Sequence, residues 1–133
     1  MSQKRILVVD DEIGFSRLLK INLEQTGDYV VQVETSAPAA LIRAEQFQPD
    51  LMLLDVMMPG MDGGELAARL STKPKLKGVP IVFLTAAVKK EEVSSRGGQI
   101  GGYPFLAKPA DLSQVIACIQ QHLPGGKGRP GLP

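Results

Sequence analysis

Short apolar runs alternate along the chain with longer segments in which apolar residues recur at helical spacing. The runs are four or five residues long and almost wholly apolar. This is typical of strands that are buried on both faces of a parallel sheet. Five strands are predicted in this way: Ile6–Val9, Tyr29–Val33, Leu51–Leu54, Ile81–Leu84 and Tyr103–Leu106.

The segments between these runs predict helices. In the first segment, apolar residues follow each other at intervals of three and four residues: Phe15, Leu18, Leu19 and Leu23. Gly27 then ends the helix, as a C-cap glycine would. The other predicted helices begin after the caps Ser36 and Asp111 or lie within Gly64–Leu70 and Lys89–Arg96.

Five strands and five helices in strict alternation predict an α/β fold, in which a doubly wound parallel sheet carries helices on both faces. A chain of 133 residues suffices for one such core, so we expect a single domain over residues 1–123. Residues 124–133 are rich in proline and glycine, and we expect them to form a disordered tail.

The composition narrows the possible partners and compartments. With 15 basic and 14 acidic residues the net charge is +1, so neither nucleic acid nor a membrane surface is expected as a partner. The single cysteine, Cys118, cannot form an internal disulfide. No apolar run approaches the ~18 residues of a membrane span, and the N-terminus is not a signal peptide. We therefore expect a cytoplasmic protein.

Polar side chains follow four of the five predicted strands. Asp10 and Asp11 follow the first strand, Asp55 the third, Thr85 the fourth and Lys108 the fifth. Because ligands bind where the carboxyl ends of parallel strands meet, we expect these groups to converge. Clustered carboxylates repel one another unless they are protonated or bind a metal, and oxygen ligands with open positions favour Mg²⁺. Such a metal prepares a site for phosphate, and Asp55 on the central strand is the natural nucleophile.

Four short motifs in this order resemble those of the response-regulator receiver domain of two-component signalling, in its single-domain form. They are Val8-Val9-Asp10-Asp11-Glu12, the run LLDVMMPGMDG at 53–63, Leu84-Thr85-Ala86 and Lys108-Pro109. The resemblance covers residues 4–123. It implies a flavodoxin-like sheet with the strand order 2-1-3-4-5.

The resemblance implies a role for each matching residue. Asp55 matches the phosphoacceptor and Asp11 a direct ligand of Mg²⁺ or Mn²⁺, while Asp10 acts on the metal largely through water. The backbone carbonyl of Met57 matches the third protein ligand. The implied function is a phosphoprotein of a phosphorelay, and the donor is a sensor histidine kinase or a phosphotransfer protein.

Three further residues are implied to detect the phosphoryl group and pass the signal on. Thr85 and Lys108 match the phosphate-sensing hydroxyl and lysine, and Phe105 matches the aromatic switch residue, which is often tyrosine in this family. Their movement is implied to change a protein-binding surface for an unknown downstream protein. The chain is then a signalling switch that assists its own phosphotransfer and dephosphorylation, as a monomer or a phosphorylation-dependent dimer.

Two features depart from the usual pattern near the fifth strand. Glycine pairs at 97–98 and 101–102 weaken the fourth predicted helix as a rigid element. Pro104 has no N–H to donate, which is tolerable because the fifth strand is expected to be an edge of the sheet.

Other functions are weighed against the same residues. A haloacid-dehalogenase-like phosphatase also forms an aspartyl phosphate, but needs a second Asp at the position of Met57 and a cap domain. A flavodoxin-like electron carrier needs a hydroxyl-rich phosphate loop where Asp10 and Asp11 stand. A pseudo-receiver, which only binds partners, remains an alternative, and so does a receiver taken from a longer protein.

Overall fold

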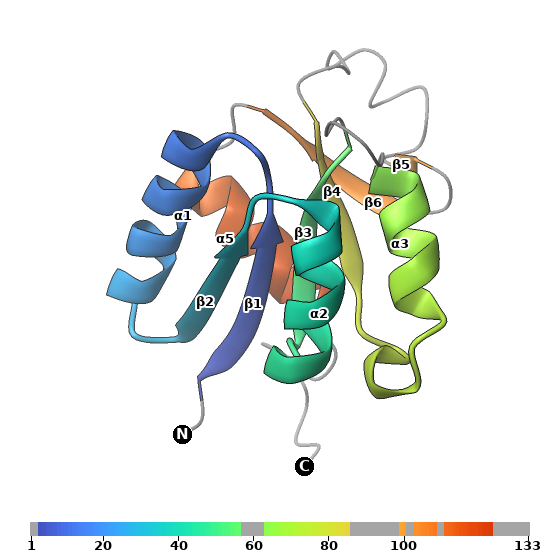
Figure 1. The fold of residues 1–133 in the computed structure, drawn as a ribbon. Coiled ribbons are helices and arrows are strands. Elements are labelled where there is room, and N and C mark those ends of the chain that lie inside the picture. The colour runs from blue at the N-terminus through green and yellow to red at the C-terminus, as the bar shows by residue number, and fades with distance from the viewer. Residues whose placement is uncertain (1–2, 57–62, 86–98, 101–102, 109–110, 124–133) are drawn as a thin grey trace.

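The computed structural model describes residues 3–56, 63–85, 99–100, 103–108 and 111–123. Its strands are β1 (Lys4–Val9), β2 (Tyr29–Glu34), β3 (Leu51–Asp55), β4 (Ile81–Thr85), β5 (Gln99–Ile100) and β6 (Tyr103–Ala107). Within the described residues they form one sheet in the order β2-β1-β3-β4-β6-β5 (Figure 1). The pairs from β2 to β6 are parallel, and β5 pairs antiparallel with β6. The predicted order 2-1-3-4-5 is therefore confirmed, with β6 as the fifth parallel strand.

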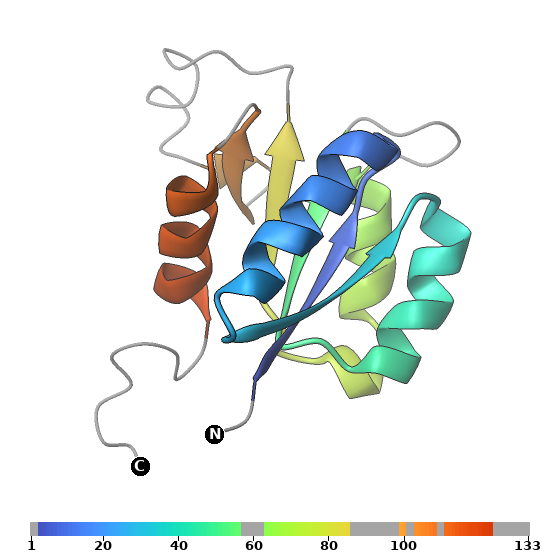
Figure 2. The ribbon, with the colours of Figure 1, turned by 90° about the vertical axis from the view of Figure 1, so that its left-hand side faces the viewer.

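Helices cover both faces of this sheet. Helices α1 (Ile13–Gln25) and α5 (Leu112–His122) lie on one face, and α2 (Ala37–Phe47) and α3 (Gly63–Ser71) lie on the other (Figures 1 and 2). A short 3-10 helix, η1 (Pro74–Leu76), follows α3. None of the helices in the described ranges is long and apolar enough to cross a lipid bilayer.

The core is divided between the two faces, because successive side chains of a strand point to opposite sides. In β1, Ile6 and Val8 pack in the cluster that includes α1 and α5, whereas Leu7 and Val9 pack in the cluster that includes α2 and α3. All four side chains are fully buried. This explains why the strands are almost wholly apolar in sequence.

The helix ends are formed as the sequence predicts. The Ser36 hydroxyl accepts a hydrogen bond from the backbone N–H of Ala39, at 3.4 Å. The Asp111 carboxylate accepts from the N–H of Gln114 at 2.9 Å, and the Gln114 side chain accepts from the N–H of Asp111, which completes a capping box. Gly27, just after α1, has the positive φ of 84° that favours glycine.

One residue of the predicted apolar face of α1 does not belong to the core. Leu18, one of the apolar residues whose spacing predicts this helix, is 59% exposed. Ser16 is buried instead, and its hydroxyl donates to the carbonyl of Glu12 at 2.7 Å. Apolar residues three and four positions apart lie in two neighbouring rows along a helix. In α1 the buried row is that of Ser16, Leu19 and Leu23.

The region before β6 contains a strand that the sequence does not predict. Gln99 and Ile100 pair with Pro104 and Tyr103, so the outer side of β6 is covered at its start. The sequence predicts that the fifth strand is an edge of the sheet. It is the last of the parallel strands, but β5 lies outside it. A strand of two residues between glycine pairs has too few residues to show an apolar pattern. The predicted fourth helix and the tail at 124–133 lie outside the described residues.

Candidate functional site

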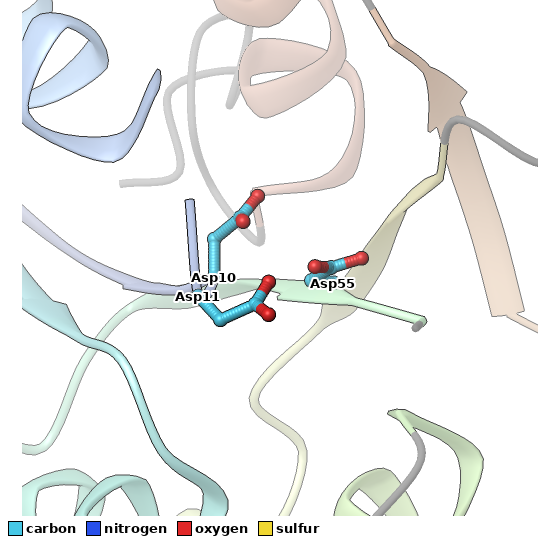
Figure 3. Close-up of side chains that lie close together, drawn as sticks. All are labelled: Asp10, Asp11 and Asp55. Atoms are coloured by element: carbon cyan, nitrogen blue, oxygen red, sulfur yellow. The ribbon is translucent and has the colours of Figure 1, made fainter. Parts of the chain in front are cut away.

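Three aspartates meet at the carboxyl ends of β1 and β3, which are neighbours in the sheet (Figure 3). Asp10 and Asp11 directly follow β1, and Asp55 is the last residue of β3. One carboxylate oxygen from each residue lies within 4.8 Å of the others. Asp10 and Asp55 are buried and Asp11 is exposed, so this acidic cluster is open to solvent on one side.

Lys108 directly follows β6, and its ammonium group lies against the acidic cluster. Its Nζ atom is 2.7 Å from Asp10 Oδ2 and 3.8 Å from Asp55 Oδ2. It also lies 4.8 Å from the centre of the Phe15 ring, and only 8% of the lysine side chain is exposed. Burial alone would lower the pKa of Lys108, but hydrogen bonds to Asp10 and Glu12 and the nearby negative charges raise it above its usual value.

The acidic cluster has the chemistry of a site for a hard divalent cation. Three carboxylates concentrate negative charge at this end of the sheet, and among the described residues Lys108 contacts two of them, Asp10 and Asp55. The donors are all oxygen atoms, and the exposed Asp11 leaves room for water ligands, which suits Mg²⁺. The predicted ligand at the backbone of Met57 lies outside the described residues.

The predicted phosphate-sensing and switch residues lie on β4, which pairs with β3, and on β6, which pairs with β4. Thr85 is the last residue of β4 and is buried. The backbone N–H of Lys108 donates to the Thr85 carbonyl at 2.8 Å, which joins the ends of β4 and β6. Phe105 in β6 is 7% exposed and packs in the cluster with Phe83, so its ring already has the inward position.

Gly63 holds the start of α3 against the end of β3. Its N–H donates to the carbonyl of Val56 at 2.9 Å. A Cβ atom on Gly63 would lie 2.7 Å from the Asp55 carbonyl oxygen and 2.8 Å from the Val56 Cα. The absence of a side chain therefore allows the close approach that places α3 beside Asp55.

No role in the site is predicted from the sequence for Glu12 or for Phe15, which is only one of the apolar residues that predict the first helix. Glu12 Oε1 lies 2.6 Å from Lys108 Nζ, closer than any aspartate oxygen. Glu12 belongs to the first motif, and Phe15 is one helical turn further along α1. In the sequence, Glu12 stands next to two residues of the site. This position alone does not show where its side chain points.

Comparison with known proteins identifies the family. The model of the response regulator receiver domain matches residues 6–120. The chain belongs to this family. A receiver domain is a signalling switch rather than a conventional enzyme, and receiver domains take phosphate from histidine kinases. The cluster of Asp10, Asp11 and Asp55 matches the magnesium site of such domains and is consistent with Mg²⁺-dependent phosphorylation on aspartate.

Two relatives show how the chain compares in length. It is 37% identical over 122 residues to a 14.6 kDa protein of Leptolyngbya boryana, and the match covers 92% of both chains. It is 34% identical over 116 residues to the DNA-binding dual master transcriptional regulator RpaA of Synechocystis, where the match covers 87% of this chain and 47% of RpaA. The chain thus spans about half the length, or less, of several curated regulators that it matches.

Solved structures share the fold over nearly the whole chain. The chemotaxis protein CheY4 of Vibrio cholerae has a TM-score of 0.79 at 27% identity, and the match covers 92% of this chain and all of CheY4. The receiver domain of the sensor histidine kinase PA1611 of Pseudomonas aeruginosa has a TM-score of 0.76 at 22% identity, covering 92% of this chain and 99% of that domain. That structure holds a magnesium ion in its active-site cleft, and its likeness to this chain is one of fold.

Proposed function

We propose that Asp55 accepts a phosphoryl group from a phosphohistidine of a sensor histidine kinase or phosphotransfer protein. The observation that carries this proposal is the buried Asp55 carboxylate, with two more carboxylates within 4.8 Å and the Lys108 ammonium at 3.8 Å. Nucleophile, metal ligands and a fixed positive charge thus occupy one end of the sheet. We place the receiver domain at residues 1–123, in the cytoplasm.

In the proposed transfer, an Asp55 carboxylate oxygen attacks the phosphorus atom. The P–N bond to the histidine breaks, and its electron pair remains on the imidazole nitrogen. Lys108 neutralises charge on the phosphoryl oxygens, and Thr85 donates a hydrogen bond to one of them. Mg²⁺, held by Asp11, Asp55 and the backbone carbonyl of Met57, and by Asp10 largely through water, would supply positive charge to the transferring group.

The proposed kinase-docking surface lies on α1. Within the described residues four large apolar side chains are exposed, and three of them lie on this helix: Ile13, Leu18 and Ile21. Helix α1 starts two residues after Asp11, so a partner bound there is next to the acidic cluster. Exposed apolar side chains grouped beside a reactive site favour a protein partner.

The output of the proposed switch passes through Thr85 and Phe105 to a downstream protein. The chain acts as a monomer or as a phosphorylation-dependent dimer.

The test is labelling by acetyl phosphate or a phosphorylated kinase, with and without Mg²⁺. We expect the wild type to be labelled only when Mg²⁺ is present, and Asp55→Asn not to be labelled. The matched control is Asp50→Asn, which lies next to the opposite end of the same strand and should be labelled like the wild type. Labelling of Asp55→Asn at the wild-type level would show that another residue is the phosphoacceptor.

A further inference from the structure

Lys108 is shared between a buried and an exposed carboxylate. Its Nζ atom lies 2.7 Å from Asp10, which is fully buried, and 2.6 Å from Glu12, whose side chain is 62% exposed. The same atom is 3.8 Å from Asp55 Oδ2, beyond hydrogen-bond distance. A phosphoryl group on Asp55 would therefore have to draw the ammonium away from its present partners.

The position of Glu12 is fixed by its backbone and not by its side chain. Its N–H donates to Asp10 Oδ1 at 2.9 Å, and its carbonyl accepts from the N–H and the hydroxyl of Ser16 at 3.0 and 2.7 Å. Although Glu12 is the N-cap residue of α1, its side chain makes no capping hydrogen bond. Within the described part of the chain, its carboxylate pairs with Lys108. The side chain can therefore be changed without loss of the backbone contacts that hold α1.

We propose that Glu12 is a positioning residue that competes with the phosphoryl group for Lys108. This rests on the proposed function of Asp55 as phosphoacceptor. Glu12 holds the ammonium on the solvent side of the site, next to the buried Asp10. Because the ion pair has an exposed member, it is weak enough for a doubly charged phosphoryl group to displace it. At a given concentration of the phosphoryl donor, Glu12 thereby lowers the population of the phosphorylated conformation.

Removal of this competitor should favour phosphoryl binding. In Glu12→Gln the side chain keeps its size but loses its charge, so Lys108 is released towards Asp55. For an ion pair with one exposed member we expect an effect of about two- to fivefold. The dissociation constant for beryllofluoride, a mimic of the phosphoryl group, should fall by this factor at saturating Mg²⁺. The affinity for Mg²⁺ alone should stay the same or decrease, because a nearby negative charge has been lost.

The matched control is Glu34→Gln, which also removes a charge at this end of the sheet. Glu34 ends β2, the neighbour of β1, and its carboxylate pairs with Arg43 at 2.9 Å. A general change in electrostatic potential would affect both variants, whereas the proposed competition affects Glu12→Gln alone. Urea unfolding of both variants checks that the fold is retained.

The experiment separates this proposal from the proposed function. If the wild type binds beryllofluoride with Mg²⁺ and Asp55→Asn does not, the site is the phosphoacceptor site. A two- to fivefold lower dissociation constant in Glu12→Gln, with no gain in Glu34→Gln, then supports the competition. An unchanged or weaker affinity in Glu12→Gln, or an equal gain in both variants, overturns it and leaves the phosphoacceptor assignment intact. Failure of the wild type to bind the mimic would instead contradict the proposed function.

Discussion

Gly63→Ala is expected to disturb stability and the site together. The new Cβ would lie 2.7 Å from the Asp55 carbonyl oxygen and 2.8 Å from the Val56 Cα. Both neighbours are backbone atoms, so no change of side-chain rotamer can relieve the contact. Either the first turn of α3 or the end of β3 must shift, and the shift would move the backbone of Asp55.

The size of the effect follows from two opposing terms. Overpacking in a well-packed region costs about 1–3 kcal/mol. Replacing glycine by alanine in a helix returns up to about 1 kcal/mol. We therefore expect a net loss of about 1–2 kcal/mol, which lowers the melting temperature of a domain of this size by roughly 3–8 °C.

Gly14→Ala is the matched control, because it makes the same substitution at the start of another helix. Gly14 is the second residue of α1, and no heavy atom lies within 4 Å of the position of its Cβ. Without a clash only the helix propensity remains, so this variant should be unchanged or more stable by up to about 1 kcal/mol.

Urea unfolding measures both variants, and labelling by acetyl phosphate measures the site. We expect a lower midpoint and slower labelling for Gly63→Ala, and a wild-type or higher midpoint for Gly14→Ala. If Gly63→Ala unfolds at the wild-type midpoint with the same dependence on urea, the close contact of α3 with β3 does not constrain the site and the reasoning is wrong.

Three further predictions concern charge, pH and the switch. Without Mg²⁺, Asp11→Ala should be at least as stable as the wild type, because like charges at the cluster oppose folding. The variant should also lose the stabilisation that Mg²⁺ gives the wild type in thermal melts. A large loss of stability without metal would contradict this. Burial raises the pKa of the Cys118 thiol from 9.0 to about 11, so the folded state keeps the proton longer. Stability should therefore fall as pH rises from 9 through 11, by up to roughly 2–3 kcal/mol, and Cys118→Ala should lack this part of the loss in urea unfolding at each pH. Beryllofluoride should change the NMR signals of Phe105 and of residues 86–104, and unchanged signals with the mimic bound at Asp55 would exclude this route.

Much of the fold follows from local sequence, because the central strands β1, β3 and β4 are buried on both faces. A run such as Ile6–Val9 needs two apolar environments, which only the centre of a doubly wound sheet provides. The parallel arrangement then brings residues after β1 and β3 to one edge. The proximity of Asp10, Asp11 and Asp55 is in this sense a consequence of strand pattern and chain order.

The remaining features depend on contacts between elements. Spacing in α1 does not show whether Leu18 or Ser16 faces the sheet, because this depends on the rotation of the helix against β2 and α5. The two residues of β5 form a strand only through their pairing with β6. Glu12 reaches Lys108, 96 positions away in the chain, only because β1 and β6 end at the same side of the sheet. Such contacts have no local signature in the sequence.

Backbone hydrogen bonding limits how the signal can leave the site. Asp55 ends β3, Thr85 ends the neighbouring β4, and the N–H of Lys108 donates to the Thr85 carbonyl at 2.8 Å. In the proposed switch, a phosphoryl group on Asp55 brings about two negative charges and attracts the side chains of Thr85, which ends β4, and Lys108, which follows β6. Because the ends of β4 and β6 are joined by this hydrogen bond, we expect the response to fall on side chains. Phe105 is already buried, at 7% exposure, so in the proposed switch phosphorylation needs only to raise the population of an arrangement that this sequence can adopt. The size of that shift is then set by how much more strongly Lys108 and Thr85 bind the phosphoryl group in the inward than in the outward arrangement.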